Sequence, residues 1–483
     1  MITMHLPRLF AAAAFALALA APSVAATDFI DTFQIDLYGG RLADAEAAAT
    51  ARLAVTPDDG QARFALGAAQ FLTAVEHLVQ GLHHYGLRST YDGFGLGILP
   101  ILRLPIPDNP DPAPITYEAF RGLLSRFADD LGVADSTLAG VTGEADLPLD
   151  LTRLKLDFVG DGEAAHKEAL ASMLAVVIGV PFSSDEAAGM PVAFDASDVL
   201  WLRAYCNLLI AIADFPLGYD FREAYRTTFA GIFPKGADFL STKVQDEAAA
   251  MARRLSELGV GPDEYIPYPG GSSRDDSWKE TPEGKRYLEA ESLQRALDYA
   301  GIADLVAFIH LMHWPVADAP RLKDVLTHLE AMSALSRQSW KSILAETDDG
   351  GVPSQPAQPG AEQGTTAVPP SPTGGEWIPN PRQHGALPRM RITPEIVDGW
   401  MQFLDQFDGI LAGRILLPHW RYRQGFNLNK MLTEPGPFDP VLMIQGTGIE
   451  PYLEDGQIAD PAVWSRIMEI FGGNFMRYFI WIN

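Results

Sequence analysis

The sequence predicts a mainly α-helical protein, an irregular multi-helix globular bundle with a few short β-strands. Apolar residues recur every three or four positions along many segments, which is the spacing of a helix with one buried face. Strict alternation of apolar and polar residues is confined to short stretches, which indicates that strands are a minor component. Hydrophobic residues make up 47% of the 483 residues, so the chain can build a large core.

The N-terminus has the pattern of an export signal. Arg8 precedes an apolar run from Leu9 to Ala21, and small residues at 22–26 provide a cleavage site. We therefore predict a signal peptide over residues 1–26 and a periplasmic or secreted mature chain, as in exported bacterial proteins. The run is short for a membrane span, so we expect no such span after signal cleavage. Because Cys206 is the single cysteine, no intrachain disulfide can form.

Helical patterns over 41–55 and 60–85 follow the signal. Their junction, Pro57-Asp58-Asp59, and the start of the second helix, Ala62-Arg63-Phe64-Ala65-Leu66-Gly67, resemble a tetratricopeptide unit. The resemblance covers one repeat and implies a helical hairpin. Further helices are predicted from Thr116 onward and over about 195–215, 220–232, 238–258, 283–300, 302–313, 320–346 and 393–411.

Three further segments qualify this helical prediction. The helix near 195–215 is the most apolar, but Arg203, Asn207 and Asp214 interrupt it, which favours a buried central helix over a membrane span. Alternating residues over 147–158 predict short strands, and 441–444 is a further strand candidate.

Composition divides the chain into segments. Residues 348–376 are rich in Pro, Gly, Ser, Gln and Thr, which is typical of a low-complexity linker or a disordered insertion. We predict a helical domain over 27–347 before this segment. Residues 377–483 then form a helical C-terminal segment with short strands, packed on the first domain.

The charge balance limits the partners of the protein. Lys and Arg total 36 against 62 Asp and Glu, which gives a formal charge of −26. Such a chain repels nucleic acid and anionic membrane surfaces overall and favours cations, calcium included. We therefore expect no nucleic-acid partner, and we expect the partner to be a protein or a small-molecule ligand.

A metal-ligand pattern lies within residues 157–168. Asp157, Asp161, Gly162 and Glu168 stand at positions 1, 5, 6 and 12 of a loop that resembles the EF-hand calcium loop, and Glu163 offers its carbonyl at position 7. Position 3 is Val159, which has no side-chain oxygen, and no second loop is visible to pair with this one. The resemblance implies one calcium ion held as a structural staple. The alternative is a strand-to-helix turn in which the glycines serve geometry alone.

A second candidate site lies near the C-terminus. Basic and aromatic residues gather there in an acidic chain, and the turn over 445–448 is their natural neighbour. Arginine guanidinium groups and aromatic rings can hold an anionic or carbohydrate ligand. Alternatively, the arginines can pair with carboxylates inside the protein, and we favour this second interpretation. The candidate residues are Arg414, His419, Trp420, Arg421 and Arg423.

No recognised catalytic motif occurs in the chain, so the sequence leaves open whether it is an enzyme. The function that we favour is that of an exported binding or structural protein with one bound calcium ion. The alternative is an exported hydrolase of carbohydrate or another cell-envelope polymer, with its pocket near His419, Trp420 and Arg421. A pair of catalytic carboxylates can come from anywhere in a chain, so the sequence does not exclude it.

Overall fold

A computed structural model describes ten segments of the chain: 29–87, 106–143, 145–163, 167–170, 191–227, 232–236, 250–251, 253–259, 276–344 and 394–472. The predicted signal peptide over 1–26 and the predicted linker over 348–376 lie outside these residues. The predicted fold class is confirmed, because the protein is mainly α-helical with a few short strands.

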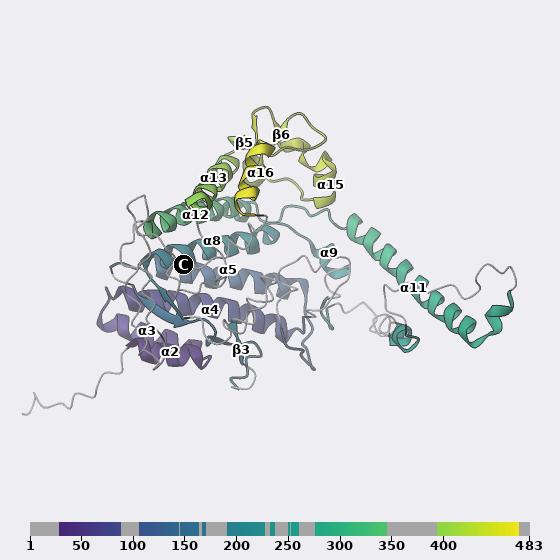
Figure 1. Ribbon diagram of the computed structural model, residues 1–483, viewed down its shortest axis with the longest axis horizontal. Coiled ribbons are helices and arrows are strands. Elements are labelled where there is room, and N and C mark those ends of the chain that lie inside the picture. Colours follow the sequence, from purple (N-terminus) through teal and green to yellow (C-terminus); the bar gives the residue numbers. More distant parts are fainter. Residues whose placement is uncertain are drawn as a thin grey trace, which may run out of the picture.

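The body is a stack of antiparallel and crossing helices (Figure 1). Each helix packs on the next in the order α2, α3, α4, α5, α8 and α12. Their bounds are Phe29–Tyr38, Leu42–Val55, Gly60–His84, Tyr117–Ala139, Ala196–Leu217 and Ala319–Ile343. The helix starts follow the capping residues of the sequence, since Asp59, Thr116 and Asp195 each accept a hydrogen bond from a backbone N–H of the first turn.

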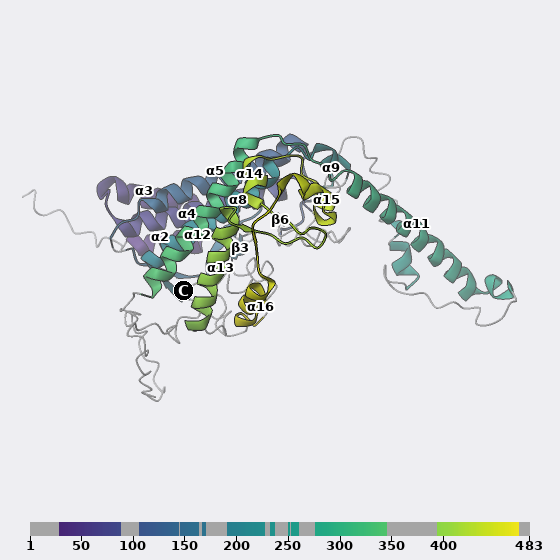
Figure 2. The same cartoon turned by 90° about the horizontal axis from the view of Figure 1, so that it is seen from above.

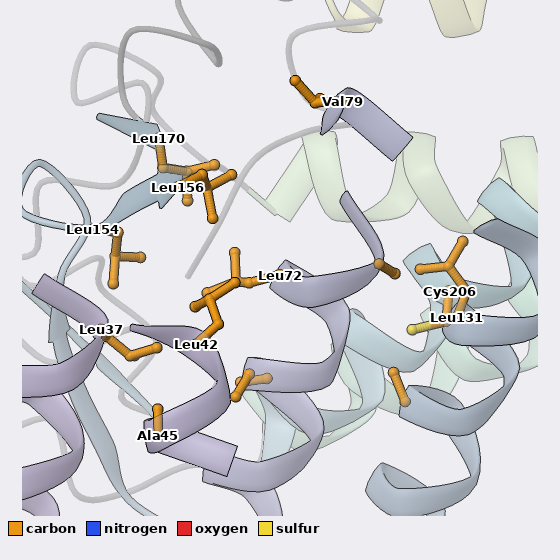
Figure 3. Close-up of a cluster of buried hydrophobic side chains, with 14 of the residues drawn as sticks. Leu37, Leu42, Ala45, Leu72, Val79, Leu131, Leu154, Leu156, Leu170 and Cys206 are labelled. Atoms are coloured by element: carbon orange, nitrogen blue, oxygen red, sulfur yellow. The ribbon is translucent and has the colours of Figure 1, made fainter. Parts of the chain in front are cut away.

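The largest core cluster joins α2, α4, α5 and α8 to the strand region. Figure 3 shows Leu156 and Leu170 projecting from the strand region toward Leu72 of α4. Leu156 is fully buried, and Cys206 lies in the same cluster with no exposed surface. The alternating pattern of 147–158 therefore buries one face of two short strands against the helices.

These strands form two small antiparallel pairs. β1, Leu147–Asp150, pairs with β4, Pro191–Phe194, and β2, Lys155–Asp157, pairs with β3, Lys167–Ala169. The loop after β2 thus joins two strands, and Glu168 stands opposite Leu156 in β3. The alternative that the sequence offers for this loop is a strand-to-helix turn, and the structure differs from it because a strand follows the loop. The difference arises because backbone pairing with β2 depends on tertiary contact, which the spacing of single residues does not report.

α8 is the one helix of the described residues that is long and apolar enough to cross a membrane, and half of its most apolar window is buried in the protein. It lies between α5 and α12. Its polar residues have partners there: Asp214 accepts from Arg321 of α12 at 2.8 Å, and Asn207 contacts His328 of α12 at 2.8 Å. These are the contacts of a core helix.

A helical arm projects from the body (Figures 1 and 2). It consists of α11, Pro282–His310, with the short 3₁₀ helix η5, Asp276–Glu280, at its far end. The sequence predicts two separate helices over 283–300 and 302–313. This prediction is wrong, because α11 continues through Gly301 without a break. A single glycine weakens a helix by only about 1 kcal/mol, which neighbouring turns tolerate. α9, Arg222–Thr227, lies where the arm leaves the body.

The C-terminal lobe packs on α12 through α13, Pro394–Leu411. Asp408 of α13 accepts hydrogen bonds from Ser333 and Arg337 of α12, at 2.5 Å and 2.7 Å. The lobe continues through β5, β6, α14, α15, η6, β7, β8 and α16. Their bounds are Ile415–Leu416, Gly425–Phe426, Leu428–Thr433, Pro440–Gln445, Thr447–Tyr452, Leu453–Glu454, Gln457–Ile458 and Pro461–Ile470. β5 pairs in parallel with β8, and β6 pairs antiparallel with β7.

The strand predicted over 441–444 is a turn of helix, α15. Asp439 caps it, since its carboxylate accepts from the Leu442 N–H at 2.9 Å, and Pro440 fills the first helical position. Gly446 ends it with φ of 117°. An aspartate followed by proline is a helix-start signal that outweighs the strand preference of the apolar residues after it.

Candidate functional site

The first candidate site is the loop between β2 and β3. Asp157 ends β2 and is 7% exposed. Its Oδ1 accepts a hydrogen bond from the Gly160 N–H at 2.7 Å, and its Oδ2 accepts one from the Gly162 N–H at 2.8 Å. Both glycines have positive φ, 78° and 76°, which other residues rarely adopt. The loop therefore folds back around one carboxylate.

The next two positions continue the turn. Asp161 accepts from the Glu163 N–H through Oδ1 at 2.8 Å, so both predicted aspartate ligands organise the backbone that follows them. Glu163 is exposed. Glu168 lies in β3, and its side chain falls outside the described residues. The full predicted ligand set is thus only partly described.

Helix α4 holds this loop from the other side. Glu76 accepts from the Asp157 N–H at 2.6 Å, and the Gln80 amide donates to the Asp157 carbonyl at 2.8 Å. A Cβ on Gly160 would lie 3.4 Å from the Gln80 side chain, so the loop and the helix are in close contact. Sequence reasoning missed Glu76 and Gln80, since they are about 80 positions away and look like ordinary polar residues of a helix.

His83 of α4 reports the same contact electrostatically. Burial lowers the pKa of the His83 imidazole, while a backbone hydrogen bond at Asp108 and, more weakly, the Asp161 carboxylate act in the opposite direction. Of the loop carboxylates, Asp161 is thus the one that acts on His83.

A carboxylate has about four lone-pair positions, so accepting one N–H on each oxygen leaves Asp157 able to bind a cation as well. Within the described segments, no group of three or more His, Cys, Asp or Glu side chains comes together as a metal site. In this loop, the side chain of Glu168 and the residues 164–166 are not described.

The second candidate site is the loop after β5. The His419 Nε2 donates to the carbonyl of Ile444 at 3.0 Å, and the Trp420 indole N–H donates to the same oxygen at 3.3 Å. The Arg421 N–H donates to the His419 Nδ1 at 3.2 Å, so the two contacts of the ring require the neutral Nε2–H tautomer. These bonds attach the loop to the C-terminal end of α15.

The predicted neighbouring turn does pack against this loop. A Cβ on Gly446 would lie 2.8 Å from Tyr422 and 2.9 Å from His419, so the close approach depends on the missing side chain. The Tyr422 hydroxyl donates to Glu450 at 2.7 Å, which raises the pKa of the tyrosine. Tyr422, Ile444 and Glu450 were not among the predicted site residues.

The candidate residues lie at the surface. Trp420 is 76% exposed, and the Arg421 guanidinium carbon lies 4.8 Å from the centre of its ring. Arg414, Arg421 and Arg423 are exposed, and none of them has an ion-pair partner in the part of the chain that the structure describes. The internal pairing of arginines that we favoured from the sequence is therefore not found among those residues.

The structure brings His419, Trp420 and Arg421 together, whereas no hydrogen bond among the described residues ties Arg414 or Arg423 to them. A glycosidase needs two carboxylates on opposite sides of the scissile bond. Within the described segments, Glu450 is the carboxylate whose contact with this loop is established, and it is bound by Tyr422.

Comparison with known proteins identifies no relative: no family model, no curated protein and no solved structure matches this chain.

Proposed function

We propose that the protein is an exported binding or structural protein, periplasmic or secreted, whose helical bundle is stabilised by one calcium ion in the loop over 157–168. The observation that carries the proposal is the position of the Asp157 carboxylate. It is buried, and each of its two oxygens accepts a hydrogen bond from a backbone N–H of the loop, so the loop closes around it. Gly162 supports the same view, because its φ of 76° makes the sharp turn that the sixth position of a calcium loop needs.

In this proposal Asp157, Asp161 and Glu168 provide carboxylate oxygens and Glu163 provides its carbonyl. Calcium takes six to eight oxygens, so water completes the shell on the side of Val159. The acidic balance of the chain, with a charge of −26, favours a divalent cation over an anion. Calcium outside a cell is abundant enough to fill a site with Kd of about 10⁻⁴ to 10⁻³ M.

The role of the ion is to fasten the β2–β3 pair to α4. Glu76 and Gln80 already bind the backbone of Asp157, so an ion that rigidifies the loop also stabilises its contact with the helix. With free calcium about ten times above Kd, the stabilisation is about 1.4 kcal/mol, since it equals RT ln(1 + [Ca²⁺]/Kd). Since the entropy of unfolding is about 2.1 cal/mol/K per residue, this free energy corresponds to a shift of about 1–2 °C in the melting temperature of a chain of this length.

Thermal unfolding with increasing calcium tests the proposal. The protein is freed of metal with a chelator and melted with calcium, and separately with magnesium, which demands a tighter octahedral site. We expect calcium to raise the melting temperature and the isosteric variant Glu168→Gln to lose the increase. The matched control is Asp129→Asn, which removes one exposed carboxylate from α5 and should keep it. No increase in the wild-type protein at millimolar calcium, or an unchanged increase in Glu168→Gln, contradicts a site in this loop.

A further inference from the structure

The C-terminal lobe carries apolar side chains that its own fold does not cover. No residue of α15 is buried, although the helix reads Pro-Val-Leu-Met-Ile-Gln. Ile444 and Trp420 are each 76% exposed, and Leu442 is 41% exposed. We call Trp420, Arg421 and Ile444, which contact one another, together with the exposed Leu442 and Arg423, each two positions away in the chain, the tryptophan–arginine surface. Because large apolar groups in water are unfavourable, such a group of side chains marks an interaction site.

The surface is held in shape before any partner arrives. The Trp420 indole and the His419 ring both donate to the Ile444 carbonyl, which joins the loop after β5 to the end of α15. Gly446 lets the two segments approach closely. Since the indole N–H is already bonded within the protein, the part of Trp420 that faces outward is its apolar ring edge and faces. A partner therefore gains apolar contact with little loss of side-chain freedom.

The charge of the surface is opposite to that of the chain. The segments 414–424 and 440–449 contain three arginines and no Asp or Glu, in a protein of net charge −26. Arg421 and Arg423 are exposed and have no ion-pair partner among the described residues. Arg421 lies over the Trp420 ring, so a cation and an apolar group share one position. This surface is complementary to a partner that presents anions next to apolar groups.

We propose that the tryptophan–arginine surface docks the protein on a phospholipid bilayer that contains anionic headgroups. Trp420, Leu442 and Ile444 enter the boundary between headgroups and acyl chains, and Arg421 and Arg423 contact lipid phosphates. Tryptophan prefers this boundary because its ring is apolar on one side and polar on the other, and arginines near the surface are attracted to anionic lipid.

Area favours a bilayer over a protein partner. A stable protein interface buries about 800 Å² on each side and involves about 20–30 residues, with pockets that match the side chains. This surface offers three large apolar side chains from one loop and one short helix, whereas a bilayer accepts them without a matching pocket. Figure 1 places β6 and α15 in the C-terminal lobe, on the side of the molecule opposite α2 and α3.

The net negative charge does not prevent this contact. At physiological ionic strength the field of a charge decays over about 8 Å, so an approaching bilayer experiences mainly the charges of the nearest segments. Those segments carry Arg414, Arg421 and Arg423, and the neighbouring Glu450 carboxylate is bound by the Tyr422 hydroxyl. The inference depends on the C-terminal lobe only and stands whether or not the loop over 157–168 binds calcium.

Vesicle flotation with the full mature chain, in the presence of a chelator, tests the proposal. The probes are vesicles of phosphatidylcholine alone and of phosphatidylcholine with phosphatidylglycerol. We expect the wild-type protein to float with the anionic vesicles and Trp420→Ala or Ile444→Ser to reduce its partition about tenfold. Each substitution of Arg421→Gln or Arg423→Gln should reduce partition about fivefold on anionic vesicles and little on neutral ones.

The controls keep the same chemistry at other positions. Ile35→Ser on α2, where the side chain is 59% exposed, and Arg466→Gln on α16 should bind as the wild type does. Trp420→Phe, which keeps the apolar ring and loses the N–H, should retain most of the binding. A circular dichroism melt tests whether each variant is folded. If Trp420→Ala does not fold, Ile444→Ser replaces it as the test of apolar contact.

Three results overturn the proposal. The first is a wild-type protein that fails to float with anionic vesicles. The second is an Ile35→Ser variant that loses as much binding as Ile444→Ser. The third is a dimer in sedimentation that Trp420→Ala dissociates in the absence of lipid, since a second copy of the chain would then occupy the surface.

Discussion

Removing the Asp157 side chain should destabilise the protein even when no calcium is present. The carboxylate accepts two loop N–H groups at 2.7 and 2.8 Å, and Asp157→Ala leaves both without that partner. An amide N–H that loses a buried partner costs about 1–3 kcal/mol. Gly160 and Gly162 are themselves exposed, so water replaces part of each bond. We therefore expect Asp157→Ala to lower the free energy of unfolding by about 2–3 kcal/mol.

Urea unfolding in the presence of a chelator measures this change. The midpoint should fall while the slope stays constant, because the native surface exposed on unfolding is the same. Asp161→Ala is the matched comparison, since Asp161 is exposed and the Glu163 N–H that it accepts is exposed too, so that its loss should cost less than about 1 kcal/mol. Equal stability of the two variants would refute the view that Asp157 organises the loop.

Two further predictions concern a helix cap and a tight turn. The Asp59 carboxylate is partly desolvated by burial, but hydrogen bonds from the Ala62 N–H and from Arg52 prevail and hold its pKa below the ordinary value. A lowered pKa gives stability that is present above the unfolded-state pKa and is lost as the pH falls through the folded-state pKa. Asp59→Ala should therefore cost about 1–2 kcal/mol at neutral pH in urea titrations, and its difference from the wild type should shrink as the pH falls through the lowered folded-state pKa. Gly446→Ala should destabilise the protein by about 2 kcal/mol or more, because φ is 117° and the new Cβ would lie 2.8 Å from Tyr422. Thermal melting measures this loss of stability. A loss no greater than that of a substitution on an exposed helix face would contradict the prediction.

Local signals predicted much of the fold. The caps at Asp59 and Thr116 begin helices at the expected positions, because a side-chain oxygen within three residues of the first free N–H needs no tertiary help. The strand predicted over 441–444 is wrong, because the Asp439-Pro440 signal that begins α15 outweighs the strand preference of the apolar residues after it.

The candidate loop was only partly predictable. Its two aspartates and its glycines lie close together in the sequence, between Asp157 and Gly162, so their roles in the turn follow from spacing. The strand after the loop cannot be predicted from spacing, because β3 forms only by pairing with β2. The contact with Glu76 joins residues 81 positions apart, and neither residue type signals the other.

The sequence by itself determined the helical class, the helix starts and the turn around Asp157, since each depends on residues a few positions apart. The tertiary structure alone decided that α4 supports that turn and that Trp420 and Ile444 remain exposed side by side. The physical reason is that periodicity and composition identify which side chains are apolar or charged. Only the packing of distant segments decides which of them find partners within the chain.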